Sequence, residues 1–302
     1  DAAALRNAAI LLCRRRRDNV QAADLAEQAR LDGVADANTF GLKGHALAGL
    51  GCHEPAALAY NEALKLAPGD AHLQHIAAAA RVRSNAPEDF VRALFDGGAD
   101  RFEAHIIALG YCIPGLIRRH VIEFAALANT GPVLDLGCGT GLIALALSDL
   151  PLGPFTGIDV SPRMLERARA KGLYSSLREA RLPAALHGDT TTWRLILAGD
   201  VLCYFGALDD MFRAVFGRTR PGGRFIFSLE ELLPDHNSAM LHDTDWAAGR
   251  MGRHAHAAEY VSATAAASGF QCLRLDRETL RYEAGGPVAG LLVVLERPRG
   301  DA

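Results

Sequence analysis

The hydrophobic and polar positions of this 302-residue chain follow two different rhythms. Residues 1–85 are rich in alanine, and their apolar positions recur with the period of a helix. From residue 131 onward, short apolar runs such as VLDL and FTGID alternate with stretches of helical period. Such alternation predicts a mostly parallel sheet covered by helices on both faces. The pattern therefore predicts an all-α region at 1–85, a helical connector or lid at 86–130 and an α/β domain at 131–302.

Small residues recur in the all-α region at positions where two helices would touch. Between residues 38 and 68 the small positions are Gly44, Gly51, Ala56 and Ala63, and the bulky ones are Phe40, Leu47 and Tyr60. This spacing resembles the tetratricopeptide repeat, including its closing proline at Pro68, and Ala22 and Ala29 lie one repeat earlier. Stacked helix pairs of this kind hold a peptide or a protein on their concave side. The resemblance implies such a partner, and the alternative is that the helices only brace the second domain.

The first apolar run of the α/β region ends in a glycine-rich turn with the sequence GCGTG, residues 137–141. Open parallel sheets bind ligands beyond the carboxyl ends of their strands. Glycine permits a positive φ angle and lets a ligand approach the bare backbone closely. The turn formed by Gly137, Cys138, Gly139 and Gly141 is therefore predicted to hold a ligand.

Two cofactor classes use glycine turns of this kind. The dinucleotide fingerprint G-x-G-x-x-G places a third glycine where this chain has Leu142, which disfavours NAD. The stretch instead resembles the first motif of the class I S-adenosylmethionine-dependent methyltransferases, an acidic residue followed by x-G-x-G-x-G. The resemblance implies that Asp135 helps to fix the methionine ammonium. That cofactor carries a sulfonium and an ammonium but no phosphate, so a nearby acid suits it.

Further motifs extend the resemblance to about residues 86–297. The stretch GIDVSPRML places Asp159 where the family binds the ribose hydroxyls, and Ser161 with Pro162 is typical of a helix start. Met164 is expected near the adenine, or else only in the core. Glu179 is expected to accept from the adenine amino group, or else to be a surface carboxylate. The resemblance assigns these residues to the cofactor: Asp135, Gly137, Cys138, Gly139, Gly141, Asp159, Val160, Met164, Glu179 and Asp200.

Methyl transfer from a sulfonium is a direct displacement, so the protein mainly aligns the reacting atoms. A base is needed only where the nucleophile must lose a proton. The exit of the fourth predicted strand contributes Tyr204, and the stretch GRHAHAAEY contributes His256 and Tyr260. These three residues are predicted to orient the substrate or take its proton, and the alternative for His256 is a surface histidine at a helix start. No metal site is predicted, because no Cys or Asp cluster stands beside the histidines.

The composition and net charge of the chain limit the kinds of partner and the compartment that we expect for it. The formal net charge is -3 and is evenly spread, which argues against nucleic acid as a partner. No run of 18 apolar residues predicts a membrane span, and no N-terminal pattern reads as a signal peptide. Six cysteines without a C-x-x-C pair fit a reducing cytoplasm.

The expected fold is an α/β, Rossmann-like, seven-stranded and mostly parallel sheet, preceded by an all-α domain that resembles tetratricopeptide repeats. The expected function is methyl transfer from S-adenosylmethionine, a small-molecule donor, to an oxygen or nitrogen of an acceptor, with a peptide or protein as one candidate. A scaffold that binds the cofactor without turnover is the main alternative. An NAD(P)-dependent oxidoreductase is disfavoured by Leu142.

Overall fold

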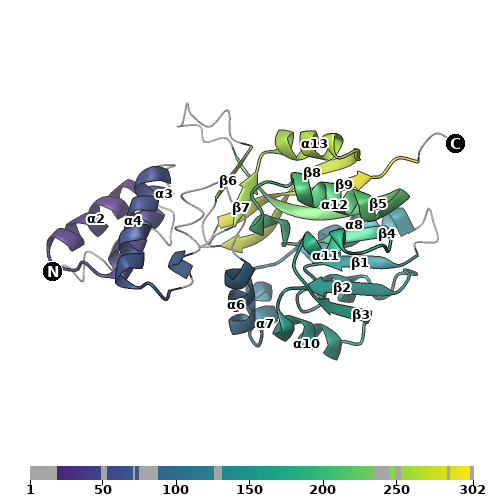
Figure 1. Ribbon diagram of the computed structural model, residues 1–302, viewed down its shortest axis with the longest axis horizontal. Coiled ribbons are helices and arrows are strands. Elements are labelled where there is room, and N and C mark those ends of the chain that lie inside the picture. Colours follow the sequence, from purple (N-terminus) through teal and green to yellow (C-terminus); the bar gives the residue numbers. More distant parts are fainter. Residues whose placement is uncertain are drawn as a thin grey trace. The chain divides into compact units, whose positions relative to one another are not determined.

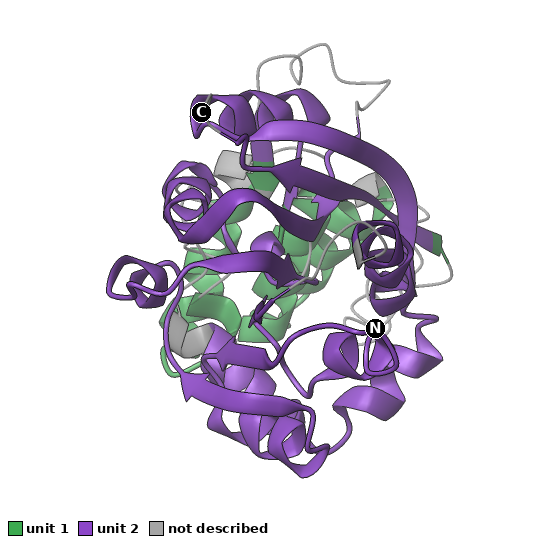
Figure 2. Ribbon diagram, turned by 90° about the vertical axis from the view of Figure 1, so that its right-hand side faces the viewer, with its two compact units in different colours: residues 1–90, 247–254, 284–286 green, residues 91–246, 255–283, 287–302 purple. Residues whose placement is uncertain are grey.

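The computed structural model describes residues 19–48, 53–70, 72–74, 88–125, 131–233, 245–248, 253–283 and 286–299. The chain divides into two compact units, which Figure 2 shows in different colours. The first comprises residues 1–90, 247–254 and 284–286, and the second comprises residues 91–246, 255–283 and 287–302. The helices of residues 91–125, which the sequence predicts to be a connector or lid, are thus grouped with the sheet.

The described helices of the first unit pack through small side chains. They are α2 (Asn19–Leu31), α3 (Ala37–Ala48) and α4 (His53–Leu66). The predicted small positions Ala22, Ala29, Ala56 and Ala63 are all completely buried. A Cβ atom at Gly44 would lie 2.4 Å from the Tyr60 ring, so glycine lets α3 approach α4 closely. Gly51 lies outside the described residues.

The strands described by the structure form one nine-stranded sheet (Figure 1). They are β1 (Val133–Leu136), β2 (Phe155–Asp159), β3 (Tyr174–Glu179), β4 (Trp193–Ala198), β5 (Thr219–Glu231), β6 (Trp246–Ala248), β7 (His254–His256), β8 (Gln271–Glu283) and β9 (Gly286–Glu296). The order is β3-β2-β1-β4-β5-β7-β6, and β9 pairs with both β5 and β8. The pairs β1–β2, β1–β4, β2–β3, β4–β5 and β5–β7 are parallel, and β5–β9 is antiparallel. The two strands beyond the predicted seven are the short β6 and β7, of three residues each, in a stretch predicted to be a loop.

Helices connect and cover the strands. They are α6 (Glu88–Gly98), α7 (Phe102–Ala108), α8 (Ile113–Ala125), α9 (Leu142–Ala146), α10 (Pro162–Ala170), α11 (Ala184–His187), α12 (Asp209–Arg218) and α13 (Ala258–Ala267), with the 3-10 turn η1 (Leu202–Tyr204). The sheet is thus mixed but dominated by parallel pairs, as the alternating pattern predicts.

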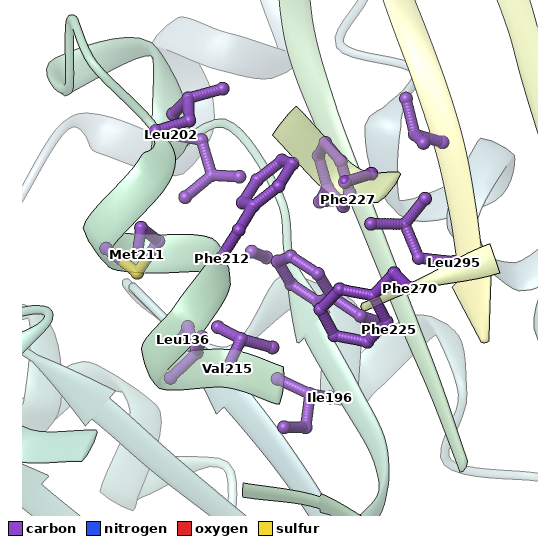
Figure 3. Packing of buried hydrophobic residues seen from close by; sticks show 14 of the residues in the cluster. Leu136, Ile196, Leu202, Met211, Phe212, Val215, Phe225, Phe227, Phe270 and Leu295 are labelled. Carbon is purple, nitrogen blue, oxygen red and sulfur yellow. The ribbon is translucent and has the colours of Figure 1, made fainter. Parts of the chain in front are cut away.

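One face of the sheet packs against α12 and α13. In Figure 3 the Phe212 side chain of α12 lies against Phe225 and Phe227 of β5. The ring centroids of Phe212 and Phe227 are 5.4 Å apart. Burial of each such side chain contributes about 2–3 kcal/mol. This cluster anchors the strands whose carboxyl ends form the site.

The opposite face packs against α8 and α9. Ile117 of α8 and Ile143 of α9 share a buried cluster with Val133 of β1 and Leu195 of β4. Both faces of the central strands are covered, which explains why the strands read as nearly continuous apolar runs. Because side chains alternate along a strand, Asp135 lies on the same face as Val133. An acidic side chain is thereby placed in an apolar layer.

Two features are absent from the described ranges. No helix there is long and apolar enough to cross a membrane. No group of three or more His, Cys, Asp and Glu side chains there is arranged to hold a metal ion.

Candidate functional site

The predicted glycine turn follows β1 directly. Gly137, Gly139 and Gly141 have φ angles of +62°, +52° and +89°, all in the left-handed region. Residues with a Cβ atom adopt this region at a cost, whereas glycine does so freely. Cys138 N donates to Ile158 O at 3.0 Å, which ties the turn to β2.

The three glycines differ in what surrounds them. A Cβ atom at Gly137 would lie 2.4 Å from Val201 Cγ2, and one at Gly141 would lie 3.0 Å from Tyr174 Cε2. A Cβ atom at Gly139 would meet no described atom within 4 Å. Gly137 and Gly141 are therefore required by neighbouring side chains of the protein itself. Gly139 borders open space, so a ligand has access to the backbone there.

Asp135 lies behind this turn rather than at its open surface. The residue is completely buried, and Tyr174 Oη donates to its Oδ2 atom at 2.7 Å. Its Oδ1 atom has no hydrogen-bond partner among the described residues. Burial raises the pKa of this carboxyl to about 7, although the Tyr174 hydrogen bond acts in the opposite direction. Asp135 therefore lies behind the turn and is shielded from direct contact with anything that binds at the open side of Gly139.

Asp159, at the end of β2, holds the glycine turn through hydrogen bonds to the backbone. Its Oδ2 atom accepts from Gly139 N at 2.8 Å, and its Oδ1 atom accepts from Ser161 N at 2.9 Å. Burial raises the pKa of Asp159, and these backbone hydrogen bonds oppose the rise. Each carboxylate oxygen has a second acceptor position, so the group retains capacity for ligand hydroxyls. The predicted helix start is also present, since Ser161 Oγ accepts from Met164 N at 3.1 Å.

The other predicted cofactor residues lie near this edge of the sheet in different environments. Met164 is 1% exposed and packs in the interior. Cys138 is buried, and burial raises the pKa of its thiol, which disfavours the reactive thiolate. Val160 follows β2 and is partly exposed. Glu179 pairs with Asp159 in the β2–β3 register and forms an ion pair with Arg92 at 2.5 Å.

The exit of β4 carries a carboxylate in an unusual conformation. Asp200 has a φ angle of +57°, the one left-handed residue other than glycine in the described chain. Its backbone N donates to Ser228 Oγ at 2.9 Å, and Arg281 Nη1 donates to its Oδ1 atom at 3.2 Å. Strained backbone of this kind is concentrated at functional sites.

Arg281 is a site residue that the sequence reasoning missed. Its side chain is 2% exposed, lies 81 positions from Asp200 in the chain, and also forms ion pairs with Glu230 and Glu283. Arg281 lies near the end of β8, and the residues next to it in the sequence do not indicate that it pairs with Asp200. A buried arginine needs this pairing, because an unpaired buried charge is strongly destabilising.

The three predicted catalytic residues are held by contacts within the protein. His256 is completely buried, and its Nε2 atom lies 2.9 Å from Gly206 O, to which it donates. The alternative of a surface histidine is therefore wrong. Tyr260 Oη accepts from Leu208 N at 2.8 Å, and Tyr204 is 7% exposed. The structure assigns these side chains clear packing roles, and their catalytic role stays a prediction.

Comparison with known proteins agrees with this geometry. Residues 133–223 match the family model described as a methyltransferase domain. The chain is 35% identical over 148 residues to the biotin biosynthesis bifunctional protein BioCD of Bordetella avium. The matched stretch covers 47% of this chain and 30% of that protein. It is 34% identical over 154 residues to trans-aconitate 2-methyltransferase of Methylobacterium radiotolerans. This matched stretch covers 45% of this chain and 56% of that protein. The chain thus spans between about a third and just over half of these curated relatives.

A solved structure extends the likeness in fold. Magnesium protoporphyrin IX methyltransferase of Synechocystis PCC 6803 with bound S-adenosylhomocysteine covers 70% of this chain and 99% of its own, with 17% identity and a TM-score of 0.53. The fold and the matched domain together define the class. Residues 133–223 thus match a methyltransferase domain, within a sheet that shares the fold of that solved methyltransferase.

Proposed function

We propose that this chain transfers a methyl group from S-adenosylmethionine to an oxygen or nitrogen atom of an acceptor. The observation that carries the proposal is the open space at Gly139, at the carboxyl end of the first parallel strand, with Asp159 hydrogen-bonded to the same residue. Ligands of open α/β sheets bind at this edge. The match of residues 133–223 to a methyltransferase domain supports the same assignment.

The charges around the turn fit this cofactor. Asp135 and Asp159 lie behind and beside the turn, and each favours a cation and repels a phosphate. S-adenosylmethionine has a sulfonium, an ammonium and a ribose diol, and no phosphate. Asp159 would hold the ribose hydroxyls, Asp200 would face the methionine end, and Glu179 would reach the adenine amino group once released from Arg92. A pyrophosphate at the same turn would meet two acids.

When bound, the cofactor supplies a methyl carbon that its sulfonium makes electrophilic. The work of this chain is to align the acceptor with that carbon and to exclude water. An acceptor that must lose a proton requires a base, and His256, Tyr204 and Tyr260 remain the predicted candidates. Because His256 donates one ring N–H to Gly206 O, a role as a base would fall to its other ring nitrogen.

The first unit is the proposed source of acceptor specificity. Its buried alanines and the close approach of Gly44 to Tyr60 support the tetratricopeptide-like arrangement, and such arrays bind peptides or proteins. Among the relatives, ribosomal protein L11 methyltransferase of Pseudomonas aeruginosa is named for a protein acceptor, and the trans-aconitate enzyme for a small carboxylic acid. We favour a protein or peptide acceptor. The second candidate function is a scaffold without turnover, since helices that resemble a protein-binding array would serve a scaffold equally well.

Titration calorimetry with S-adenosylhomocysteine and, separately, with NADH tests the cofactor assignment. Micromolar affinity for the first and no heat from the second is the expected result. The reverse result would contradict the proposal. Transfer of a labelled methyl group to a lysate then separates an enzyme from a scaffold. The matched control for that assay is Asp159→Ala, which removes the predicted ribose ligand.

A further inference from the structure

Tyr174 reaches the cofactor turn from a strand that does not border β1. Its strand, β3, pairs with β2, and β2 pairs with β1. The side chain crosses β2, and its hydroxyl donates to Asp135 Oδ2 at 2.7 Å. The contact joins residues 39 positions apart and places a phenol directly behind the turn.

Two glycines leave the space through which the ring passes. A Cβ atom at Gly157 of β2 would lie 3.0 Å from Tyr174 Cε1. A Cβ atom at Gly141 of the turn would lie 3.0 Å from Tyr174 Cε2 and 3.5 Å from its hydroxyl. Any larger residue at either position displaces the ring. The Phe155 ring, edge-on at 6.2 Å, supports it from β2.

Asp135 is completely buried and Tyr174 is partly exposed, and other titratable groups of the site surround the pair. The titratable groups that face Asp135 are Tyr174 from β3, Asp159 from β2 and Cys138 from the turn. These groups are acids, so none of them offsets a negative charge on Asp135. Oδ1 of Asp135 has no hydrogen-bond partner in the described chain, so the Tyr174 hydroxyl is the group that holds this carboxylate.

We propose that Tyr174 is a positioning residue of the cofactor site, which holds Asp135 beneath the glycine turn so that the charge of Asp135 and cofactor binding are coupled. The inference rests on the proposed function, since it takes a cationic cofactor as the ligand. Tyr174 acts through Asp135 and the turn and does not itself touch the ligand. It therefore adds a control element that the glycine motif does not contain.

The coupling has a definite sign. Burial brings the pKa of Asp135 to about 7, so near neutral pH the group is divided between its neutral and ionised forms. A cation above the turn favours the ionised form, lowers this pKa and releases a proton. Affinity for S-adenosylmethionine should therefore rise from pH 6 to pH 8, by about fivefold if the pKa falls by about one unit on binding. Below pH 6 the benefit is lost because Asp135 is neutral.

Removal of the phenol hydroxyl should move this profile. The Tyr174 hydrogen bond stabilises the carboxylate, so Tyr174→Phe should shift the midpoint upward by about one pH unit. Asp135→Asn should flatten the profile near neutrality, and Tyr174→Phe should then have no further effect on it. Tyr111→Phe removes a hydroxyl from the same buried cluster and should leave the profile unchanged.

The experiment is calorimetric titration of the full chain with S-adenosylmethionine between pH 5.5 and 9. A merely structural role for Tyr174 would lower stability without moving the midpoint. For the unaltered chain, titration at pH 7 in two buffers of different ionisation enthalpy should show proton release, a test that needs no variant to fold. Binding without proton release, or an unshifted midpoint in Tyr174→Phe, overturns the inference and leaves the proposed function standing. Absence of binding at every pH overturns the proposed function itself.

Discussion

The exits of β1 and β4 are adjacent strand ends that use left-handed backbone in opposite ways. At β1 the left-handed positions are glycines, and the acidic side chain lies buried behind them. At β4 the left-handed position is Asp200, whose carboxylate remains partly exposed. The first exit removes side chains and so provides space. The second keeps a charged side chain where glycine would relieve the strain.

The stabilising contacts differ accordingly. Gly139 is held by the carboxylate of Asp159 through its backbone N–H. Left-handed backbone at Asp200 costs about 1–2 kcal/mol, and its hydrogen bonds to Ser228 and Arg281 offset that cost. A strained residue held by two partners indicates that the carboxylate is needed at this place. The β1 end thus provides space in front of a buried acid, whereas the β4 end keeps its carboxylate partly exposed.

Substitution within the β1 turn should give the largest effect. Gly137→Ala combines a left-handed φ angle with a 2.4 Å approach to Val201, so we expect a loss of more than about 3 kcal/mol of unfolding free energy. Gly139→Ala is the matched control, with a similar φ angle and no neighbour, and should lose about 1 kcal/mol. Gly139→Ala should nevertheless weaken cofactor binding at least tenfold. Urea unfolding and calorimetry measure both, and equal stability losses would contradict the distinction between the glycines.

At the β4 exit, Arg281→Met should cost about 3 kcal/mol. The change removes the buried guanidinium that Asp200, Glu230 and Glu283 share, and breaking such a buried ion-pair network is strongly destabilising. Arg281→Lys should recover part of the loss, because it restores the charge but not the three-way geometry. Urea unfolding at pH 7 is the measurement. A stability loss below about 1 kcal/mol would show that the carboxylates are held in other ways.

Asp159→Ala should lower the affinity for S-adenosylhomocysteine by about 10- to 100-fold. Two effects contribute, since the side chain is the predicted ribose ligand and also fixes Gly139 N and Ser161 N. Asp200→Asn, which tolerates the left-handed backbone, should lower it by about tenfold or less. Calorimetry compares the two carboxylates directly. A larger effect at Asp200 would reverse the assignment of the ribose to the β2 end.

The smallest expected effect is that of His256→Ala on cofactor binding. The variant removes a buried hydrogen bond to Gly206 O and a stacked contact with Tyr260, so stability should fall by about 1–2 kcal/mol with unchanged cofactor affinity. Turnover, once an acceptor is known, should fall by more than the loss of folded protein accounts for if His256 is the predicted base, and a fall that only matches that loss would assign His256 to structure. Full stability together with a large loss of turnover would instead establish the predicted catalytic role.

Local patterns predicted much of this architecture. The apolar runs VLDL and FTGID coincide with β1 and β2, and Ser161 with Pro162 marked the start of α10. The seven-stranded estimate missed β6 and β7, because strands of three residues are too short to show a period. The alternative that His256 is a surface residue was also wrong. The burial of its side chain depends on which distant residues pack against β7, and these are not evident from the neighbouring sequence.

The sequence alone determined the succession of strands and helices along the chain, the glycine turn, and the acids at the ends of the first two strands. These features follow from periodicity and from the backbone freedom of glycine, which are properties of neighbouring residues. Only the tertiary structure decided that Tyr174 crosses β2 to Asp135, that Arg281 holds Asp200 and that Val201 occupies the space at Gly137. Those contacts depend on β1 lying between β2 and β4, an arrangement that brings together residues far apart in the chain.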